Sequence, residues 1–254
     1  MTERKAIQKK ERRILTMRLL GSIFRVAFAL FVLAGTVRGQ ASDAHLAVVL
    51  AQLDAASAHF SNARADFQWD YYEAVVRDTT TQAGAIYFER KGASTQMGAV
   101  VVDPKTKAKE KVLEYKSGVL RLFDVPVDQV RIMKAGPNQA QYETFLTLGF
   151  GGSGKALAQA WNIADQGSET LSDSGQPVKT EKLDLMSKDP GVQKTFTHVT
   201  IWVDPVRGVT LKQVFDTPSH DRRTATYSHI KLNGKIDMGS FAIKGGPHTT
   251  HVGP

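Results

Sequence analysis

The chain has 254 residues, of which 42% are hydrophobic and 23% are charged, and it contains no cysteine. The absence of cysteine excludes a disulfide framework and a lipid-modified cysteine. The net charge of +8 would suit nucleic-acid binding if the basic residues were clustered on the folded domain. However, residues 1–41 carry nine of the 33 Lys and Arg and two of the 25 Asp and Glu, which leaves 24 basic and 23 acidic residues beyond them. We therefore expect no nucleic-acid partner.

Residues 1–41 have the pattern of a secretory signal peptide. A basic start at Met17 is followed by the apolar run Val26–Ala34 and by small residues near Gly39. The run has nine residues, about half of what a membrane span needs, so a membrane anchor is the weaker alternative. Residues 1–16 are an unusual preface to such a signal, which favours Met17 as the true start.

Residues 42–254 are expected to form a single domain that begins with an amphipathic helix. Its apolar stripe, which must face a sheet, consists of Leu46, Val49, Leu50, Leu53, Ala56 and Phe60. The next segment changes to a period of two, because Phe67, Trp69 and Tyr71 alternate with polar residues. One face of this strand therefore carries three aromatic rings.

Most of the remaining chain predicts short antiparallel strands bounded by turn residues. Strands are expected at Gly84–Arg90, Met97–Val102, Lys111–Tyr115, Val119–Phe123 and Val127–Met133, and a three-strand meander between Thr197 and Ile243. Two short helices are expected at Asn138–Leu148 and Lys155–Asn162, and Gly167–Pro177 and Gly245–Pro254 are expected to be a loop and a flexible tail. This order predicts a mostly β fold with some α (α+β), in which an antiparallel sheet curves toward a barrel.

Signatures of catalysis are weak throughout the chain. Gly149-x-x-x-x-Gly154-Lys155 imitates a phosphate-binding loop, but Ala156 stands where Ser or Thr would ligate magnesium. We interpret this stretch as a flexible connection between helices. The closest histidine pair, His248 and His251, lies in the expected tail and does not predict a metal site. We expect no catalytic residue, no metal and no cofactor.

Five motifs in one order resemble a known family. They are the helix Val48–Phe60 with its aromatic strand, Gly84–Arg90, Leu113–Asp124, Ile201–Gly208 with the sequence IWVDPVRG, and Ile236–Ile243. Together they resemble the periplasmic outer-membrane lipoprotein carrier family, which is LolA-like. The resemblance extends over nearly all of the chain after residue 41.

The resemblance implies an unclosed, strongly curved antiparallel β-barrel covered by an N-terminal helix and short lid helices. It also implies a monomer in the periplasm whose apolar cavity shelters lipoprotein acyl chains. An inner-membrane ABC transporter complex would load this cargo and an outer-membrane acceptor would receive it. Such a shield is physically necessary, because each methylene exposed to water costs about 0.8 kcal/mol.

The aromatic strand faces supply the predicted lining of the acyl cavity. Phe67, Trp69 and Tyr71 share one face of their strand, and Ile86 and Phe88 share one face of the next. An ordinary packed core explains such a stripe as well.

Arg90 has the sharpest predicted role. It continues the face of Ile86 and Phe88, and it occupies the place of a family arginine that hydrogen-bonds to the covering helices and keeps the cavity closed. The alternative is an arginine at a strand end that extends into water. Lys91 follows here where the family has proline.

Two other classes of function fit part of this pattern. A periplasmic lipid-binding or sensor module of the same fold would share every motif and differ only in its ligand. A periplasmic hydrolase would need a polar cluster inside the cavity.

Overall fold

The computed structural model describes residues 42–92, 94–134, 136 and 148–253. The chain divides into two compact units at Leu46 and Ala47, and residues 42–46 of the first unit are helical. The predicted signal peptide lies outside the described residues, as does the predicted helix at Asn138–Leu148 apart from its last residue.

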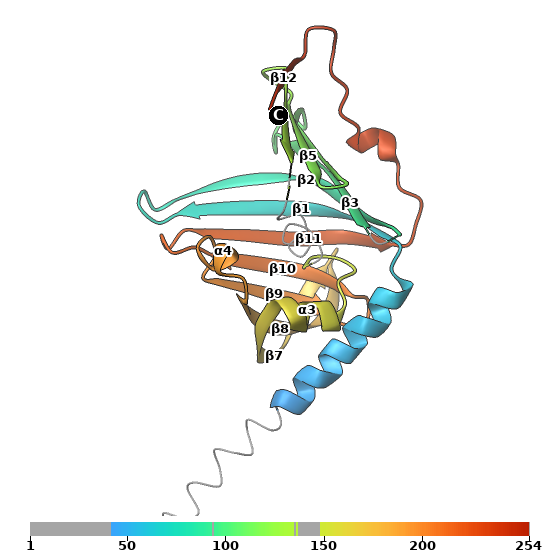
Figure 1. Ribbon diagram of the computed structural model, residues 1–254, viewed down its shortest axis with the longest axis vertical. Coiled ribbons are helices and arrows are strands. Elements are labelled where there is room, and N and C mark those ends of the chain that lie inside the picture. The colour runs from blue at the N-terminus through green and yellow to red at the C-terminus, as the bar shows by residue number, and fades with distance from the viewer. Residues whose placement is uncertain (1–41, 93, 135, 137–147, 254) are drawn as a thin grey trace, which may run out of the picture. The chain divides into compact units, whose positions relative to one another are not determined.

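One sheet dominates the second unit, and the part of the chain that the structure describes contributes twelve strands to it (Figure 1). Their order across the sheet is β12-β6-β5-β4-β3-β2-β1-β11-β10-β9-β8-β7. All neighbours are antiparallel except β12 and β6, and the two end strands β12 and β7 do not pair with each other. The predicted mostly β architecture with an unclosed antiparallel barrel is therefore confirmed.

The strands are β1 Asn62–Glu73, β2 Asp78–Lys91, β3 Ser94–Val102, β4 Lys109–Lys116, β5 Val119–Asp124, β6 Gln129–Lys134, β7 Trp161–Asp173, β8 Gln176–Ser187, β9 His198–Asp204, β10 Val209–Asp216, β11 Arg222–Leu232 and β12 Thr250–Val252. The described helices are residues 42–59, α3 Gly154–Ala160, α4 Pro190–Gln193 and the short 3-10 helix η2 Met238–Phe241. None of these helices is long and apolar enough to cross a membrane.

The register of the central strands collects large apolar residues on one side of the sheet. Ala65 lies opposite Ile86, and Phe67 lies opposite Gly84 on β2 and Tyr227 on β11. Because directly opposite residues point to the same side, these positions share one face. We call it the inner face.

The sheet curls toward its inner face at the β7 end. Leu171 and Val178, which belong to the β7–β8 hairpin, pack against the buried apolar side chains of the inner face although β7 lies at the edge of the sheet. The tip of this hairpin reaches β11, where the amide of His229 donates to the Ser174 hydroxyl oxygen at 2.9 Å. The curled sheet therefore wraps around the apolar side chains of its inner face.

The predicted loop at Gly167–Pro177 is wrong, because most of it belongs to β7 and β8. The register shifts only between Asp165 and Ser168, where Gly167 has a φ of 85°, and the actual turn is Ser174-Gly175. The predicted helix at Lys155–Asn162 is present as α3, but it ends at Ala160. Exposed β7 positions carry polar residues, so the segment lacks the apolar signal of a strand.

The C-terminal segment is also more ordered than predicted. Phe241 in η2 is 4% exposed and packs edge-on against Tyr87 at 4.8 Å, within a second apolar cluster on the outer face of the sheet. Thr250–Val252 then form β12 alongside β6, so the prediction of a flexible tail from Gly245 is wrong for these residues. Backbone pairing is the main contact of this strand, since its side chains are exposed, and the hydroxyls of Thr249 and Thr250 donate to Asp128 just before β6.

We predict that Gly84→Ala destabilises the sheet. A Cβ at this position would lie 1.8 Å from the carbonyl oxygen of Val100 on the paired strand, and backbone cannot move aside as a side chain can. The free energy of unfolding, measured by urea denaturation, should fall by about 1–3 kcal/mol. Gly234→Ala is the matched control, because its Cβ would meet nothing closer than 3.9 Å. Equal unfolding midpoints for wild type and Gly84→Ala would contradict this close approach of β2 and β3.

Candidate functional site

The centre of the inner face is occupied by Phe150, which comes from outside the sheet. Its side chain is 1% exposed. The ring stacks on Phe88 at 4.7 Å and meets Tyr227 edge-on at 5.1 Å, measured between ring centroids. Contacts of this kind add to the free energy of burying the ring. Phe150 thus fills apolar space between β2 and β11.

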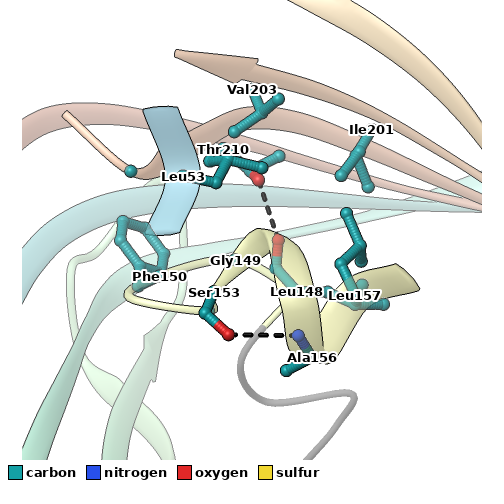
Figure 2. A pocket seen from close by; sticks show the side chains of 12 residues that line it. Leu53, Leu148, Gly149, Phe150, Ser153, Ala156, Leu157, Ile201, Val203 and Thr210 are labelled. Atoms are coloured by element: carbon teal, nitrogen blue, oxygen red, sulfur yellow. Dashed lines mark hydrogen bonds between the residues drawn. The ribbon is translucent and has the colours of Figure 1, made fainter. Parts of the chain in front are cut away.

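The segment that carries Phe150, Leu148–Ser153, is bound to β10, and we call it the cover segment. Pairing of β10 with β11 begins at Lys212, so the backbone of Thr210 is available to other partners. Its amide donates to the carbonyl oxygen of Gly149 and its hydroxyl to that of Leu148, both at 2.8 Å. Figure 2 shows the second of these bonds, together with the Ser153 side chain that accepts a hydrogen bond from the Ala156 amide at the start of α3.

Gly151 allows the cover segment to turn close to Phe60. Its φ is 71°, in the left-handed region, and a Cβ there would lie 2.3 Å from the Phe60 ring. A residue with a side chain would therefore meet both strain and collision. The turn leaves the Gly151 carbonyl oxygen facing Arg90, which donates to it.

Arg90 connects two different covering elements through its guanidinium group. Nη1 donates to the carbonyl oxygen of Ser57 at 2.6 Å, and Nη2 donates to the Ser57 hydroxyl at 3.1 Å. Nη2 also donates to the Gly151 carbonyl oxygen at 2.5 Å. Residues 47–59, which we call the cover helix, are thereby joined to the cover segment. The Ser57 hydroxyl completes the junction by donating to the Gly151 carbonyl oxygen at 2.8 Å.

The position of Arg90 at the end of the cover helix has a clear electrostatic reason. The last carbonyls of a helix have no partner within the helix, and the helix dipole places partial negative charge there. Ser57 lies in the last turn, and the guanidinium also lies 5.4 Å from the Phe60 ring centroid, within cation–π range. One cation therefore satisfies both the helix end and the cover segment.

The cavity next to the cover helix is small. A cavity of about 50 Å³ lies between Leu53 of the cover helix, Leu157 of α3, and Ile201 and Val203 of β9 (Figure 2). Sites that hold small molecules usually measure about 300–1,000 Å³. This cavity is too small to be the large apolar cavity that the family resemblance implies, and Phe150 occupies the inner face between Phe88 and Tyr227.

The residues predicted to line an acyl cavity are brought together on the inner face. Phe67, Ile86 and Phe88 are at most 4% exposed, and Trp69 packs beside Phe67 with ring centroids 4.8 Å apart. Tyr71 lies farther along β1, where the guanidinium of Arg223 covers its ring at 5.3 Å. Their role in ligand binding remains a prediction, as does the role of Arg90 as a switch.

Phe150, Gly151 and Ser57 were not predicted as parts of the site. The sequence signal for Phe150 is a single aromatic residue within the glycine-rich stretch Gly149–Gly154, a stretch that otherwise indicates a connection between helices. The stretch is not arranged as a phosphate cradle, because the Gly151 amide donates to Gly208 and the Lys155 amide to Asp54. Among the described residues, no group of three or more His, Asp or Glu side chains is placed to hold a metal ion.

No protein-family model matches the chain, and no curated protein matches it. Solved structures that align with it include the LolA superfamily protein NE2245 from Nitrosomonas europaea, 12% identical, covering 77% of this chain and 96% of that one with a TM-score of 0.37. An uncharacterized conserved protein from Thermus thermophilus is 10% identical and covers 80% and 96%, with a TM-score of 0.47. A chain of the Pseudomonas aeruginosa MucA/MucB complex is 11% identical and covers 79% and 61%, with a TM-score of 0.47.

The first of these proteins is from the family that the sequence motifs resemble. At identities of 10 to 12% and TM-scores below 0.5, none of the three bears on what this chain binds.

We predict that Arg90→Leu loosens the cover without unfolding the sheet. The substitution removes every hydrogen bond that Arg90 donates to Ser57 and Gly151, while an extended side chain remains. Hydrogen exchange of the cover segment, followed by mass spectrometry, should become about tenfold faster, as expected for the loss of charge-assisted bonds.

The matched control for this experiment is Arg64→Leu. Arg64 is paired with Asp66 at 3.1 Å and lies opposite Tyr87 of the outer-face cluster. Exchange of the cover segment should not change in this variant. Unchanged exchange in Arg90→Leu as well would show that Arg90 does not hold the cover.

Proposed function

We propose that this protein is a periplasmic carrier that shelters the acyl chains of lipoproteins on its inner face. In this proposal the cargo is loaded by an inner-membrane ABC transporter complex and delivered to an outer-membrane acceptor. The binding surface is the apolar inner face that Phe150 and the cover helix now occupy, including Phe67, Ile86 and Phe88. The closed arrangement is then the empty form of the carrier.

The observation that carries the proposal is the hydrogen bonding of Arg90. A single side chain binds the ends of two elements that cover an apolar surface. An ordinary core needs no such junction, because apolar packing alone would hold it together. A guanidinium that binds two carbonyl oxygens can release both in one movement, as a latch would.

In this mechanism the free-energy cost of opening the cover segment is comparable with the free energy gained by burying an acyl chain. Opening the cover segment exposes Phe150, which costs about 1.5–3 kcal/mol, and breaks the charge-assisted hydrogen bonds of Arg90, worth about 1.5–3 kcal/mol. It also breaks the hydrogen bonds from Thr210 to Gly149 and Leu148, worth about 0.5–1.5 kcal/mol each. Burying about ten methylenes of an acyl chain contributes about 8 kcal/mol. Cargo can therefore displace the cover, and the closed state returns part of that free energy when the cargo leaves.

Transfer between membranes tests the carrier function directly. A labelled triacylated lipoprotein should move from donor to acceptor membranes when the purified protein is present. Arg90→Leu should load as well as wild type but release its cargo more slowly, because the closed state competes less with the loaded one. A protein that binds lipid but transfers no lipoprotein would instead be a lipid-binding or sensor module.

We predict that Phe150→Ala strengthens binding of apolar ligands. The ring that occupies the inner face is removed, so a ligand no longer has to displace it. The dissociation constant for anilinonaphthalene sulfonate, measured by fluorescence titration, should fall by about tenfold, equivalent to about 1.4 kcal/mol. Thermal unfolding should be followed in parallel, because loss of a buried Phe costs about 3–5 kcal/mol of stability.

Phe241→Ala is the matched control, since Phe241 is 4% exposed but lies in the outer-face cluster. Dye binding should be the same in this variant and in wild type. If Phe241→Ala and Phe150→Ala gain equal affinity for the dye, the gain reflects a general loosening of the fold, and the inner face is not the binding surface.

A further inference from the structure

Two polar side chains lie within the apolar inner face. Gln213 of β10 and Tyr227 of β11 are each 4% exposed. The Tyr227 hydroxyl donates to Oε1 of Gln213 at 3.1 Å. Their neighbours on the same face include Leu211, at 1% exposed, and Phe150. Burying polar groups in such surroundings is unfavourable unless they are hydrogen-bonded.

The bond between these two residues leaves one part of the pair for other partners. Tyr227 uses its only proton and Gln213 uses its carbonyl oxygen, so the amide NH₂ of Gln213 is the donor group that remains. Burial raises the pKa of Tyr227 above its ordinary value, so the hydroxyl is neutral at physiological pH and stays a donor. Tyr227 therefore fixes which end of the Gln213 amide points away from it.

The NH₂ end of Gln213 lies against the cover segment. Nε2 is 3.5 Å from the point that a Cβ on Gly149 would occupy. Gly149 belongs to the same segment as Phe150 and Gly151, so this amide would be uncovered when the segment leaves β10, which breaks both the Arg90 junction and the hydrogen bonds from Thr210. An uncovered amide in an apolar site is unfavourable unless an acceptor reaches it.

We infer that Gln213, oriented by Tyr227, binds the carbonyl oxygen of an acyl chain on the inner face. The inference rests on the proposed function and narrows its ligand to ester-linked or amide-linked chains, because a plain hydrocarbon offers no acceptor. The methylenes next to the carbonyl would occupy the space that Phe150 fills between Phe88 and Tyr227. Gln213 thereby sets how far the chain enters.

The test compares two lipids that differ only in this carbonyl. Palmitoyl lysophosphatidylcholine has an ester carbonyl, and its hexadecyl ether counterpart has the same headgroup and chain length without it. Displacement of anilinonaphthalene sulfonate below the critical micelle concentration gives both dissociation constants. Wild type should bind the ester about fivefold more tightly, the effect of one hydrogen bond.

Variants identify the residue that hydrogen-bonds to the carbonyl oxygen of the lipid. Gln213→Leu should bind both lipids with the affinity that wild type has for the ether. Gln213→Met preserves chain length and serves the same purpose if the Leu variant does not fold. Gln68→Leu is the matched control, because Gln68 is exposed on β1 and bonds to Asp70, and it should retain the preference for the ester.

N-palmitoylserine extends the test to amide-linked chains such as those of lipoproteins. Weaker binding of this compound by Gln213→Leu is expected, and a loss confined to the ester would assign the site to lipid esters. Equal affinity of wild type for ester and ether would overturn the inference and leave the carrier proposal standing. Binding of neither lipid by folded wild type would overturn both.

Discussion

An unclosed sheet with an apolar inner face needs more cover than its own strands supply. Here the cover is made of a helix and a short segment that are far apart in sequence, and the guanidinium of Arg90 is where they meet. All but one of its acceptors are backbone carbonyl oxygens, so the junction depends on where the chain runs more than on which side chains it carries. The helix end and the turn at Gly151 meet at this contact, while hydrogen bonds from Thr210 hold the rest of the cover segment, including the backbone next to Phe150, on β10.

The sequence predicted most of the sheet, because β1 to β6 and β9 to β11 alternate apolar and polar residues or form short apolar runs between turn residues. It did not predict β8, nor β7, whose exposed side chains are mostly polar and whose register shift contains Gly167. It did not predict β12 either, because backbone pairing with β6 and hydrogen bonds to Asp128 define that strand, and its side chains show no apolar pattern. Segments with little apolar periodicity obtain their structure from neighbours, and neighbours are not visible in a single sequence.

The candidate site was predictable only where it lies on regular strands. Arg90 was found because it continues the face of Phe88 at a period of two, whereas Phe150 lies in a glycine-rich stretch without periodicity. Gln213 also follows the period of β10, but both faces of that strand are buried along much of its length, so its direction could not be assigned. These residues come together only because Leu148–Ser153 binds the start of β10, which does not pair with β11.

Under the proposed carrier function, the closed state resembles a loaded state in which the protein supplies its own cargo. The Phe150 ring occupies apolar space, and Gly149 lies next to the amide of Gln213, so the protein itself covers both parts of the inner face. Displacement by an acyl chain is then an exchange of similar contacts, and its net free energy is small compared with the gross free energy of burial. The apparent affinity equals the intrinsic affinity multiplied by the fraction of open molecules. The strength of the Arg90 junction therefore sets both how readily such a protein would load and how completely it would release.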